Sequence, residues 1–197
     1  MFIEENKKNE KGENMKIIFC RHGETDSNVK NIMQGASVDT PLNANGIQQA
    51  KELGEKVKKL GIEKIYSSTL TRSIQTGTLM AAACGLDVEP IDGIEEFHYG
   101  EVEGMYVPDA VEKFGIDKVF FEETAPELYD QHLPGGESIN QCLARLTSAI
   151  EKIKQASSGK YEKVAVVSHG ASLRLLYYYF FKVHHRLENC EWFEVEI

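Results

Sequence analysis

The sequence lacks long apolar runs: none of its segments approaches the roughly 18 residues that a membrane-spanning helix needs. Its first residues, MFIEENKKNEKGEN, also lack the apolar stretch of a secretory signal peptide. We therefore expect a cytoplasmic protein without a membrane partner. Residues 1–14 are polar, mixed in charge and without apolar periodicity, which predicts a disordered extension before a domain that begins near Met15.

Cysteine is sparse and never paired as CxxC. Four cysteines are scattered singly through apolar stretches, without neighbouring histidines: Cys20, Cys84, Cys142 and Cys190. This pattern predicts buried thiols rather than disulfides or zinc ligands. Positive charge is also scarce, because 22 Lys and Arg residues face 31 Asp and Glu residues, a net charge of -9. Such a surface repels polyanions and argues against nucleic-acid partners, although a compact anion could bind in a local basic pocket.

What the sequence contains is a chain of 197 residues with 42% hydrophobic content, enough for one α/β domain over residues 15–197. Short apolar runs predict strands at 15–20, 63–68, 86–91 and 163–168, and a terminal edge strand at 191–197. Apolar residues at three- or four-residue spacing predict helices at 47–60, 70–84, 138–153 and 171–180. This order predicts a three-layer α/β/α sandwich with a mainly parallel central sheet.

Two of the predicted strands end in the same dipeptide. His22 and Gly23 follow the first strand, and His169 and Gly170 follow the strand at 163–168. Ligands of parallel sheets bind at the carboxyl ends of the strands, so both imidazoles are expected at one rim. Glycine after each histidine allows a tight turn and lets backbone N–H groups approach an anion closely.

Two arginines accompany these histidines. Arg21 precedes His22, and Arg72 lies at the start of the helix after the second strand. Converging guanidinium groups and helix N-termini suit a phosphate dianion. Taken singly, each histidine could be a hydrogen-bonded structural residue and Arg72 a solvated surface charge. A metal site is a competing reading, but two arginines repel a divalent cation and no carboxylate cluster lies beside the histidines.

Six segments resemble the histidine phosphatase superfamily, also called phosphoglycerate mutase-like. RHGETDSN (21–28) is similar to its signature R-H-G-E-T/S-x-x-N, and VVSHGASLR (166–174) to its second histidine motif. The other matching segments are MQGASVDTPLNANGIQQA (33–50), SSTLTRSIQT (67–76), EEFHYGEVEG (95–104) and GGES (135–138). They occur in collinear order between about Met15 and Arg174. Two departures concern contacts to the substrate: one residue more than the pattern between Gly35 and Asp39, and Val102 where an aromatic residue is common.

The resemblance implies that His22 is a nucleophile that forms a phosphohistidine. It also implies that Arg21, Arg72 and His169 bind the transferring phosphoryl group. By its position in the motif, Glu96 would be the general acid, with its neighbour Glu95 as the alternative. Further positions that border the phosphate or leaving group would be Asn28, Gln34, Gly35 and Gly170. The resemblance implies no metal and no organic cofactor. Glu101 and Glu103 are expected to be solvent-side or structural.

Members of the family pass the phosphoryl group either to water or to a substrate hydroxyl. Residues 105–134, where mutases carry a basic insertion, contain only two lysines, Lys113 and Lys118, and form the expected small helical cap. We therefore favour a phosphomonoester hydrolase, monomeric or homodimeric, with a phosphoglycerate mutase as the alternative. A non-catalytic phospho-ligand binding module is the third reading, which the five retained functional positions disfavour.

The chemical identity of the phosphomonoester stays open at this point. Broad-specificity hydrolysis, α-ribazole phosphate and sugar bisphosphates all fit. Aromatic residues of the cap either pack it onto the domain or line the entrance to the site. They are Phe114, Phe120, Phe121, Tyr129 and His132.

Overall fold

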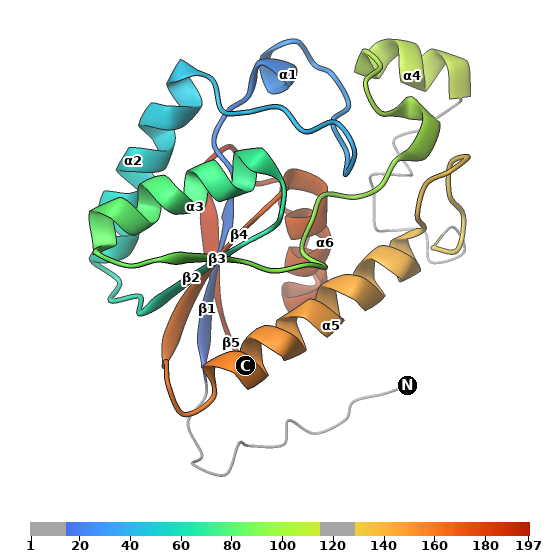
Figure 1. Ribbon diagram of the computed structural model, residues 1–197. Helices are drawn as coiled ribbons and strands as arrows, with labels where there is room; N and C mark the ends of the chain where they lie inside the picture. The colour runs from blue at the N-terminus through green and yellow to red at the C-terminus, as the bar shows by residue number, and fades with distance from the viewer. Residues whose placement is uncertain (1–14, 115–128) are drawn as a thin grey trace.

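A five-stranded sheet forms the centre of the computed structural model, which describes residues 15–114 and 129–197 (Figure 1). The strands are β1 (Lys16–Arg21), β2 (Lys64–Ser67), β3 (Val88–Pro90), β4 (Lys163–Ser168) and β5 (Trp192–Glu196). Their order is β3-β2-β4-β1-β5, and every pairing is parallel except that of β1 with β5. The terminal strand therefore lies at an edge, as expected. The predicted extension 1–14 lies outside the described residues.

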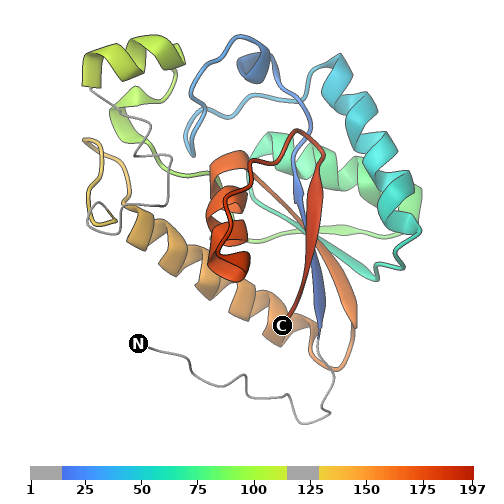
Figure 2. The ribbon, with the colours of Figure 1, turned by 180° about the vertical axis from the view of Figure 1, so that it is seen from behind.

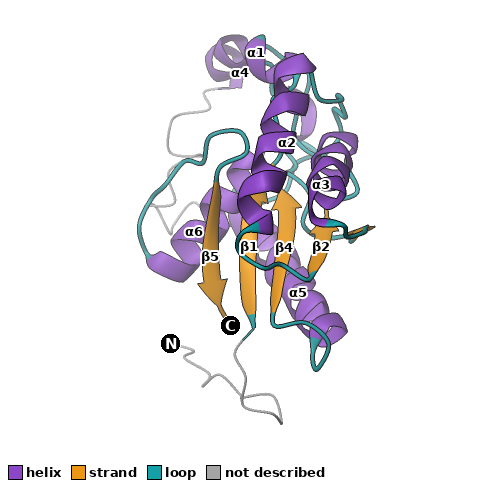
Figure 3. Ribbon diagram, turned by 90° about the vertical axis from the view of Figure 1, so that its left-hand side faces the viewer, coloured by secondary structure: helices purple, strands orange, loops and turns teal. Residues whose placement is uncertain are grey.

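Helices cover both faces of this sheet. They are α1 (Asp26–Val29), α2 (Ala44–Lys58), α3 (Thr71–Cys84), the 3-10 turn η1 (Gly100–Val102), α4 (Val107–Phe114), α5 (Ile139–Ser157) and α6 (Gly170–Phe181). Figures 1 and 3 show α2 and α3 on one side of the sheet and α5 and α6 on the other, and Figure 2 gives the reverse view. The predicted three-layer α/β/α sandwich is confirmed.

Alternation along β1 explains the two core layers. Ile17 and Phe19 point into the cluster under α5 and α6, whereas Ile18 and Cys20 point into the cluster under α2 and α3. All four side chains are fully buried, because β1 is a central strand with helices on both faces. The parallel arrangement of β1, β2 and β4 brings their carboxyl ends to one rim.

One apolar residue of the three- or four-residue spacing at 47–60 lies outside the core. Ile47 is 40% exposed, although the spacing of apolar residues places it on the inner stripe of α2. The first turn of α2 instead packs through Gly46, where a Cβ would collide with the backbone of Glu24. Because Gly46 faces inward, the next residue is turned about 100° away from the core. The stripe begins only at Ala50 and continues through Leu53.

The cap is described in part. The chain that enters α4 pairs with the residues just after α1, since Val107 N donates to Asn31 O and Ile32 bridges Tyr106. Ala110 is the buried residue of α4, and the predicted cap residues at 115–128 lie outside the described residues. All four cysteines are free thiols, with Cys84 and Cys190 half-buried rather than buried. Over the described ranges, no helix has the length and apolar character to cross a membrane.

Candidate active site

The two predicted histidines meet at the rim of the sheet. Because Arg21 pairs with Ser168 across β1 and β4, the residues that follow them lie side by side, and His22 N donates to Ser168 O over 3.0 Å. The ring centroids of His22 and His169 are 5.1 Å apart. Both side chains are buried.

His22 has a defined tautomer. Its Nδ1 lies 2.7 Å from the carbonyl oxygen of Gly23, and a carbonyl can only accept, so Nδ1 carries the hydrogen and Nε2 keeps its lone pair. Burial, and then the charges of Arg72 and Arg21, lower the pKa of His22 well below its ordinary value of 6.5. The neutral imidazole is therefore the form present at neutral pH. Thr76 fixes this turn, because its hydroxyl accepts from Gly23 N at 3.0 Å.

Arg72 is fully buried at the start of α3. Its Nη1 donates to Val38 O at 3.0 Å and its Nη2 to Gly35 O at 2.8 Å. Asp39 approaches Nη1 to 3.8 Å and also accepts from Thr71 N, at the N-terminus of the same helix. The guanidinium is thus held at its far end, while its Nε is buried without a hydrogen-bond partner.

Arg21 is held in the same way from the other side of the sheet. Its Nη1 donates to Leu187 O at 2.7 Å, and its Nε is also buried without a partner. Gly170 leaves room for it, because a Cβ there would lie 3.3 Å from Arg21 Nε. Asn189, two residues after Leu187, donates to His22 O at 2.9 Å. The segment after α6 therefore anchors both residues of the first motif.

His169 supplies a third buried polar atom without a partner, Nδ1. Its Nε2 lies 2.6 Å from the hydroxyl of Ser68. Burial lowers the pKa of His169 well below 6.5, as do the charges of Arg72 and Arg21. Arg21 and Arg72 thus each bring one unsatisfied N–H donor to the rim that carries His22. His169 adds a third when its ring hydrogen lies on Nδ1. Such groups are costly when buried unless a ligand engages them.

Glu96 reaches the same rim from the chain between β3 and η1. Its Oε1 accepts from the backbone N–H groups of Phe97, Ala171 and Ser172 at 3.0 to 3.1 Å. Its Oε2 accepts only one longer bond, from Ala171 N at 3.2 Å, so Oε2 has fewer hydrogen-bond donors than Oε1. Its charge opposes the effect of burial, which lowers the pKa of Arg72.

Glu95, the alternative acid, is committed elsewhere. Its carboxylate accepts from Thr69 Oγ1 at 3.0 Å and from Gly93 N at 2.8 Å. Glu103 is structural, with only 3% of its side chain exposed, as one of the two expected readings had it. It accepts from backbone N–H groups on both sides of the site, those of Ala36, Ser37 and Tyr99.

The remaining predicted positions shape the site through contacts with other residues of the protein. The Oδ1 atom of Asn28 accepts from Thr25 N and completes the capping box of α1. Gln34 accepts from the hydroxyls of Thr25 and Thr40. Gly35 accepts a hydrogen bond from Arg72 through its carbonyl oxygen, and Gly170 leaves room for Arg21. The sequence-based prediction missed Ser68, Thr76 and Asn189, of which Ser68 and Thr76 stand inside the quoted SSTLTRSIQT segment.

A metal site has no ligand set in the part of the chain that the structure describes: no three His, Cys, Asp or Glu residues gather there. Residues 17–196 match the model of the histidine phosphatase superfamily, branch 1. The chain belongs to this family. The match spans both histidines and the arginines that surround them.

Two curated relatives have names that refer to phosphoglycerate mutase. Phosphoglycerate mutase-like protein 4 of Arabidopsis thaliana is 34% identical over 164 residues, 82% of this chain and 69% of that protein. A probable phosphoglycerate mutase of Salmonella paratyphi B is 32% identical over 162 residues, 82% of this chain and 73% of that protein.

Two similar solved structures are named as phosphatases. A mycobacterial glucosyl-3-phosphoglycerate phosphatase in complex with VO3 has a TM-score of 0.81 and 25% identity, over 91% of this chain and 90% of that chain. A mutant phosphoserine phosphatase of Entamoeba histolytica in complex with phosphoserine has a TM-score of 0.76 and 25% identity, over 91% and 89%.

Proposed function

We propose that this protein is a phosphomonoester hydrolase that acts on small phosphorylated metabolites through a phosphohistidine intermediate. One observation carries the proposal: three buried side-chain nitrogens without partners, on Arg21, Arg72 and His169, lie around a neutral His22 whose Nε2 holds the lone pair. Donors of this kind match the oxygens of a phosphoryl group better than any neutral ligand.

In the first half-reaction, the lone pair of His22 Nε2 attacks phosphorus and a P–N bond forms. The P–O bond to the organic part breaks, and its electron pair goes to the leaving oxygen. Arg21 and Arg72 bind the phosphoryl oxygens, whose charge is spread over them in the transition state. His169 donates from Nδ1 if Ser68 donates to its Nε2, which is the tautomer that a phosphoryl oxygen requires.

The leaving alkoxide takes a proton from Glu96 Oε2. In the second half-reaction, the ionised Glu96 accepts a proton from water as the water oxygen attacks phosphorus. The P–N bond breaks, its electron pair returns to His22, and inorganic phosphate leaves. The cycle balances without a metal or an organic cofactor, and neither is part of the proposal. A cytoplasmic location and a monomer or homodimer stay predictions.

The alternative is a phosphoglycerate mutase, since one curated relative is named a probable phosphoglycerate mutase and another a phosphoglycerate mutase-like protein. A mutase must hold the phosphoglycerate in the site while water is kept out. Basic residues suit that task because they bind the substrate carboxylate. Residues 105–134 contain two lysines, no arginine and seven acidic residues, so they offer little for a substrate carboxylate. The solved phosphatases that this chain resembles favour hydrolysis as well.

The test combines a trapping experiment with a substrate panel. Protein mixed with a 32P-labelled phosphomonoester and denatured in alkali is expected to carry label that acid releases. His22→Ala should carry none, whereas His184→Ala, at an exposed position after α6, should be labelled like wild type. Phosphate release from a metabolite panel, beside 3- to 2-phosphoglycerate conversion, separates hydrolase from mutase. Undiminished turnover by His22→Ala would overturn the mechanism.

A further inference from the structure

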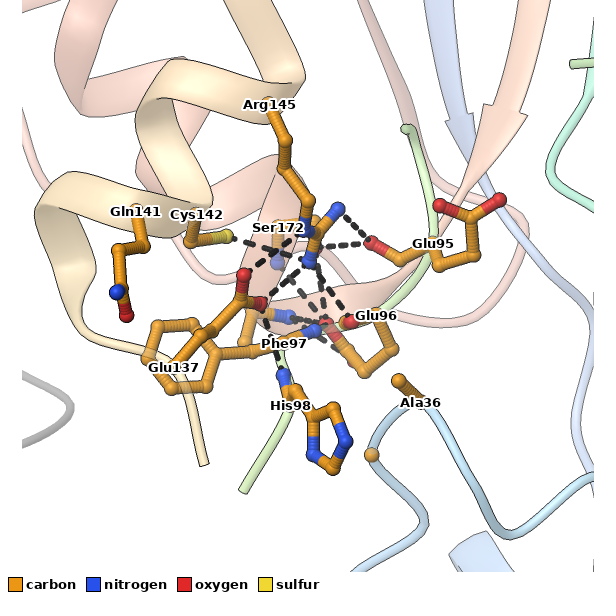
Figure 4. Close-up of polar contacts among 12 residues, drawn as sticks. Ala36, Glu95, Glu96, Phe97, His98, Glu137, Gln141, Cys142, Arg145 and Ser172 are labelled. Carbon is orange, nitrogen blue, oxygen red and sulfur yellow. Dashed lines mark hydrogen bonds and ion pairs between the residues drawn. The ribbon is translucent and has the colours of Figure 1, made fainter. Parts of the chain in front are cut away.

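Arg145 on α5 directs both terminal nitrogens of its guanidinium group at the chain that carries Glu96 (Figure 4). Nη1 donates to Gly93 O at 3.2 Å and to Glu95 O at 3.0 Å, and Nη2 donates to Glu96 O at 2.9 Å. The carboxylate of Glu137 takes the other two N–H groups, from Nε at 2.9 Å and from Nη2 at 2.6 Å. All five donors of the arginine are therefore used.

Glu137 adds a hydrogen bond to the chain beyond Glu96. Its Oε1 accepts from His98 N at 2.9 Å in addition to its bonds from Arg145. The pair thus holds backbone groups of residues 93, 95 and 96 on one side and 98 on the other. The side chains of Arg145 and Glu137 are only 25% and 14% exposed, so little water competes for these charged hydrogen bonds.

The segment 93–98 needs such contacts because it belongs to no helix or strand. Regular backbone hydrogen bonds do not fix its course. Gly93 has a φ of +99° and packs directly on α5, where a Cβ would lie 3.0 Å from Ala149 Cβ. Two hydroxyls also hold the segment, Ser168 Oγ to Ile94 O at 2.6 Å and Ser172 Oγ to Glu95 O at 2.7 Å, and Glu137 N donates to His98 O at 2.8 Å.

We propose that Arg145, together with Glu137, is a positioning residue for proton donation by Glu96. The inference rests on the proposed function, in which Glu96 is the general acid. Helix α6 holds the Glu96 carboxylate through its N-terminal N–H groups, and Arg145 on α5 holds the Glu96 backbone carbonyl. Both anchors together fix where Oε2 lies. Neither Arg145 nor Glu137 touches the reacting atoms.

The test uses two substrates that differ in their need for an acid. An alkyl phosphate needs protonation of its leaving oxygen, whereas 2,4-dinitrophenyl phosphate releases a stable anion and does not. The readout is kcat/KM, which covers the steps through cleavage of the ester bond. The variants are Arg145→Lys, which keeps the charge but loses the fork, and Glu137→Gln, which keeps the shape. Glu96→Gln is the benchmark, and Lys152→Met, at an exposed position of α5, is the control.

Glu96→Gln is expected to lower kcat/KM for the alkyl phosphate by about 10²-fold or more, the usual contribution of general acid catalysis. Arg145→Lys and Glu137→Gln should lower it roughly 10-fold, since misplacement by about 1 Å costs up to about 10²-fold. For the dinitrophenyl ester, all three should stay within about 3-fold of wild type, because the lost effect belongs to proton donation. Lys152→Met should match wild type with both substrates.

Two results would overturn the inference in distinguishable ways. If Glu96→Gln is selective for the alkyl phosphate but both Arg145→Lys and Glu137→Gln reduce the two substrates equally, the pair only stabilises the fold. If Glu96→Gln itself affects both substrates equally, the acid assignment in the proposed function fails, and the positioning role fails with it. Glu137→Gln retains the size and shape of the side chain and serves where Arg145→Lys does not fold.

Discussion

The hydroxyl of Ser68 lies 2.6 Å from Nε2 of His169, and both residues are fully buried. Leu70 N donates to the same hydroxyl oxygen at 3.4 Å, a long bond that leaves the hydroxyl hydrogen free to point at the imidazole. We expect Ser68 to donate to Nε2, which would place the ring hydrogen of His169 on Nδ1. Ser68 therefore sets which ring nitrogen of His169 can donate to a phosphoryl oxygen, and it need not touch the substrate itself.

Ser68→Ala removes this control of the tautomer. We expect kcat/KM for phosphomonoesters to fall by roughly 10-fold, and stability to drop by about 1–3 kcal/mol because Nε2 of His169 is left buried and unsatisfied. Ser67→Ala is the matched control, because the Ser67 hydroxyl is equally buried but has no partner. Steady-state kinetics and denaturant unfolding measure both effects. Equal behaviour of the two variants would contradict the assigned role.

Gly35→Ala tests the carbonyl that holds Arg72. Gly35 has a φ of +57°, and a Cβ there would overlap the carboxylate of Glu103. The clash should displace Gly35 O, which accepts from Arg72 Nη2 at 2.8 Å. We expect phosphate, as a competitive inhibitor, to bind about 10-fold more weakly when this buried charged contact is disturbed.

Gly85→Ala is the control for backbone strain. Gly85 has a φ of +69° at the end of α3, and no atom lies within 4 Å of the position that the alanine methyl group would take. The substitution should cost about 1 kcal/mol through the left-handed conformation and leave phosphate inhibition unchanged. Weakened inhibition in Gly85→Ala would mean that general destabilisation, rather than the Arg72 contact, explains the Gly35 variant.

The sequence could predict the site where its residues follow regular strands. His22 and His169 each follow a buried apolar run, and two parallel strands place their carboxyl ends together, so the pair was predictable from pattern alone. Arg72 joins them for the same reason, since it begins the helix after β2.

The contacts that orient these groups could not be predicted in the same way. Ser68 acts on a residue 101 positions later, and Arg145 acts on the backbone of Glu96, 49 positions earlier. Neither relationship leaves a local spacing, because each depends on how two elements pack. Ile47 shows the same limit, since Gly46 rather than a larger apolar residue sets the first contact of α2.

The two buried histidines should make stability depend on pH. Burial and the nearby arginines lower the pKa of His22 and His169 in the folded protein below 6.5. As the pH falls through 6.5, these two histidines therefore bind protons only in the unfolded chain. Stability is therefore lost on the acid side, by about 1 kcal/mol per histidine between pH 7 and 5.5. Urea unfolding of wild type and of His22→Gln measures it. The variant should lose about half of this dependence, and an unchanged slope would contradict a neutral His22.

Glu103→Gln tests the buried carboxylate that joins the loop around Gly35 to the chain around Tyr99. Glu103 accepts from Ala36 N at 3.3 Å, Ser37 N at 2.7 Å and Tyr99 N at 2.7 Å, and an amide oxygen accepts more weakly than a carboxylate.

Because the loop around Gly35 also holds Arg72, loosening it should raise KM about 3- to 10-fold with little change in kcat, and lower stability by about 1–2 kcal/mol. Glu101→Gln, an exposed neighbour in η1, removes the same charge and should change neither quantity. Kinetics at several ionic strengths separate the effect of a loosened loop from the effect of net charge near the site. If Glu101→Gln raises KM as much as Glu103→Gln does, the effect comes from net charge near the site and the positional role of Glu103 is excluded.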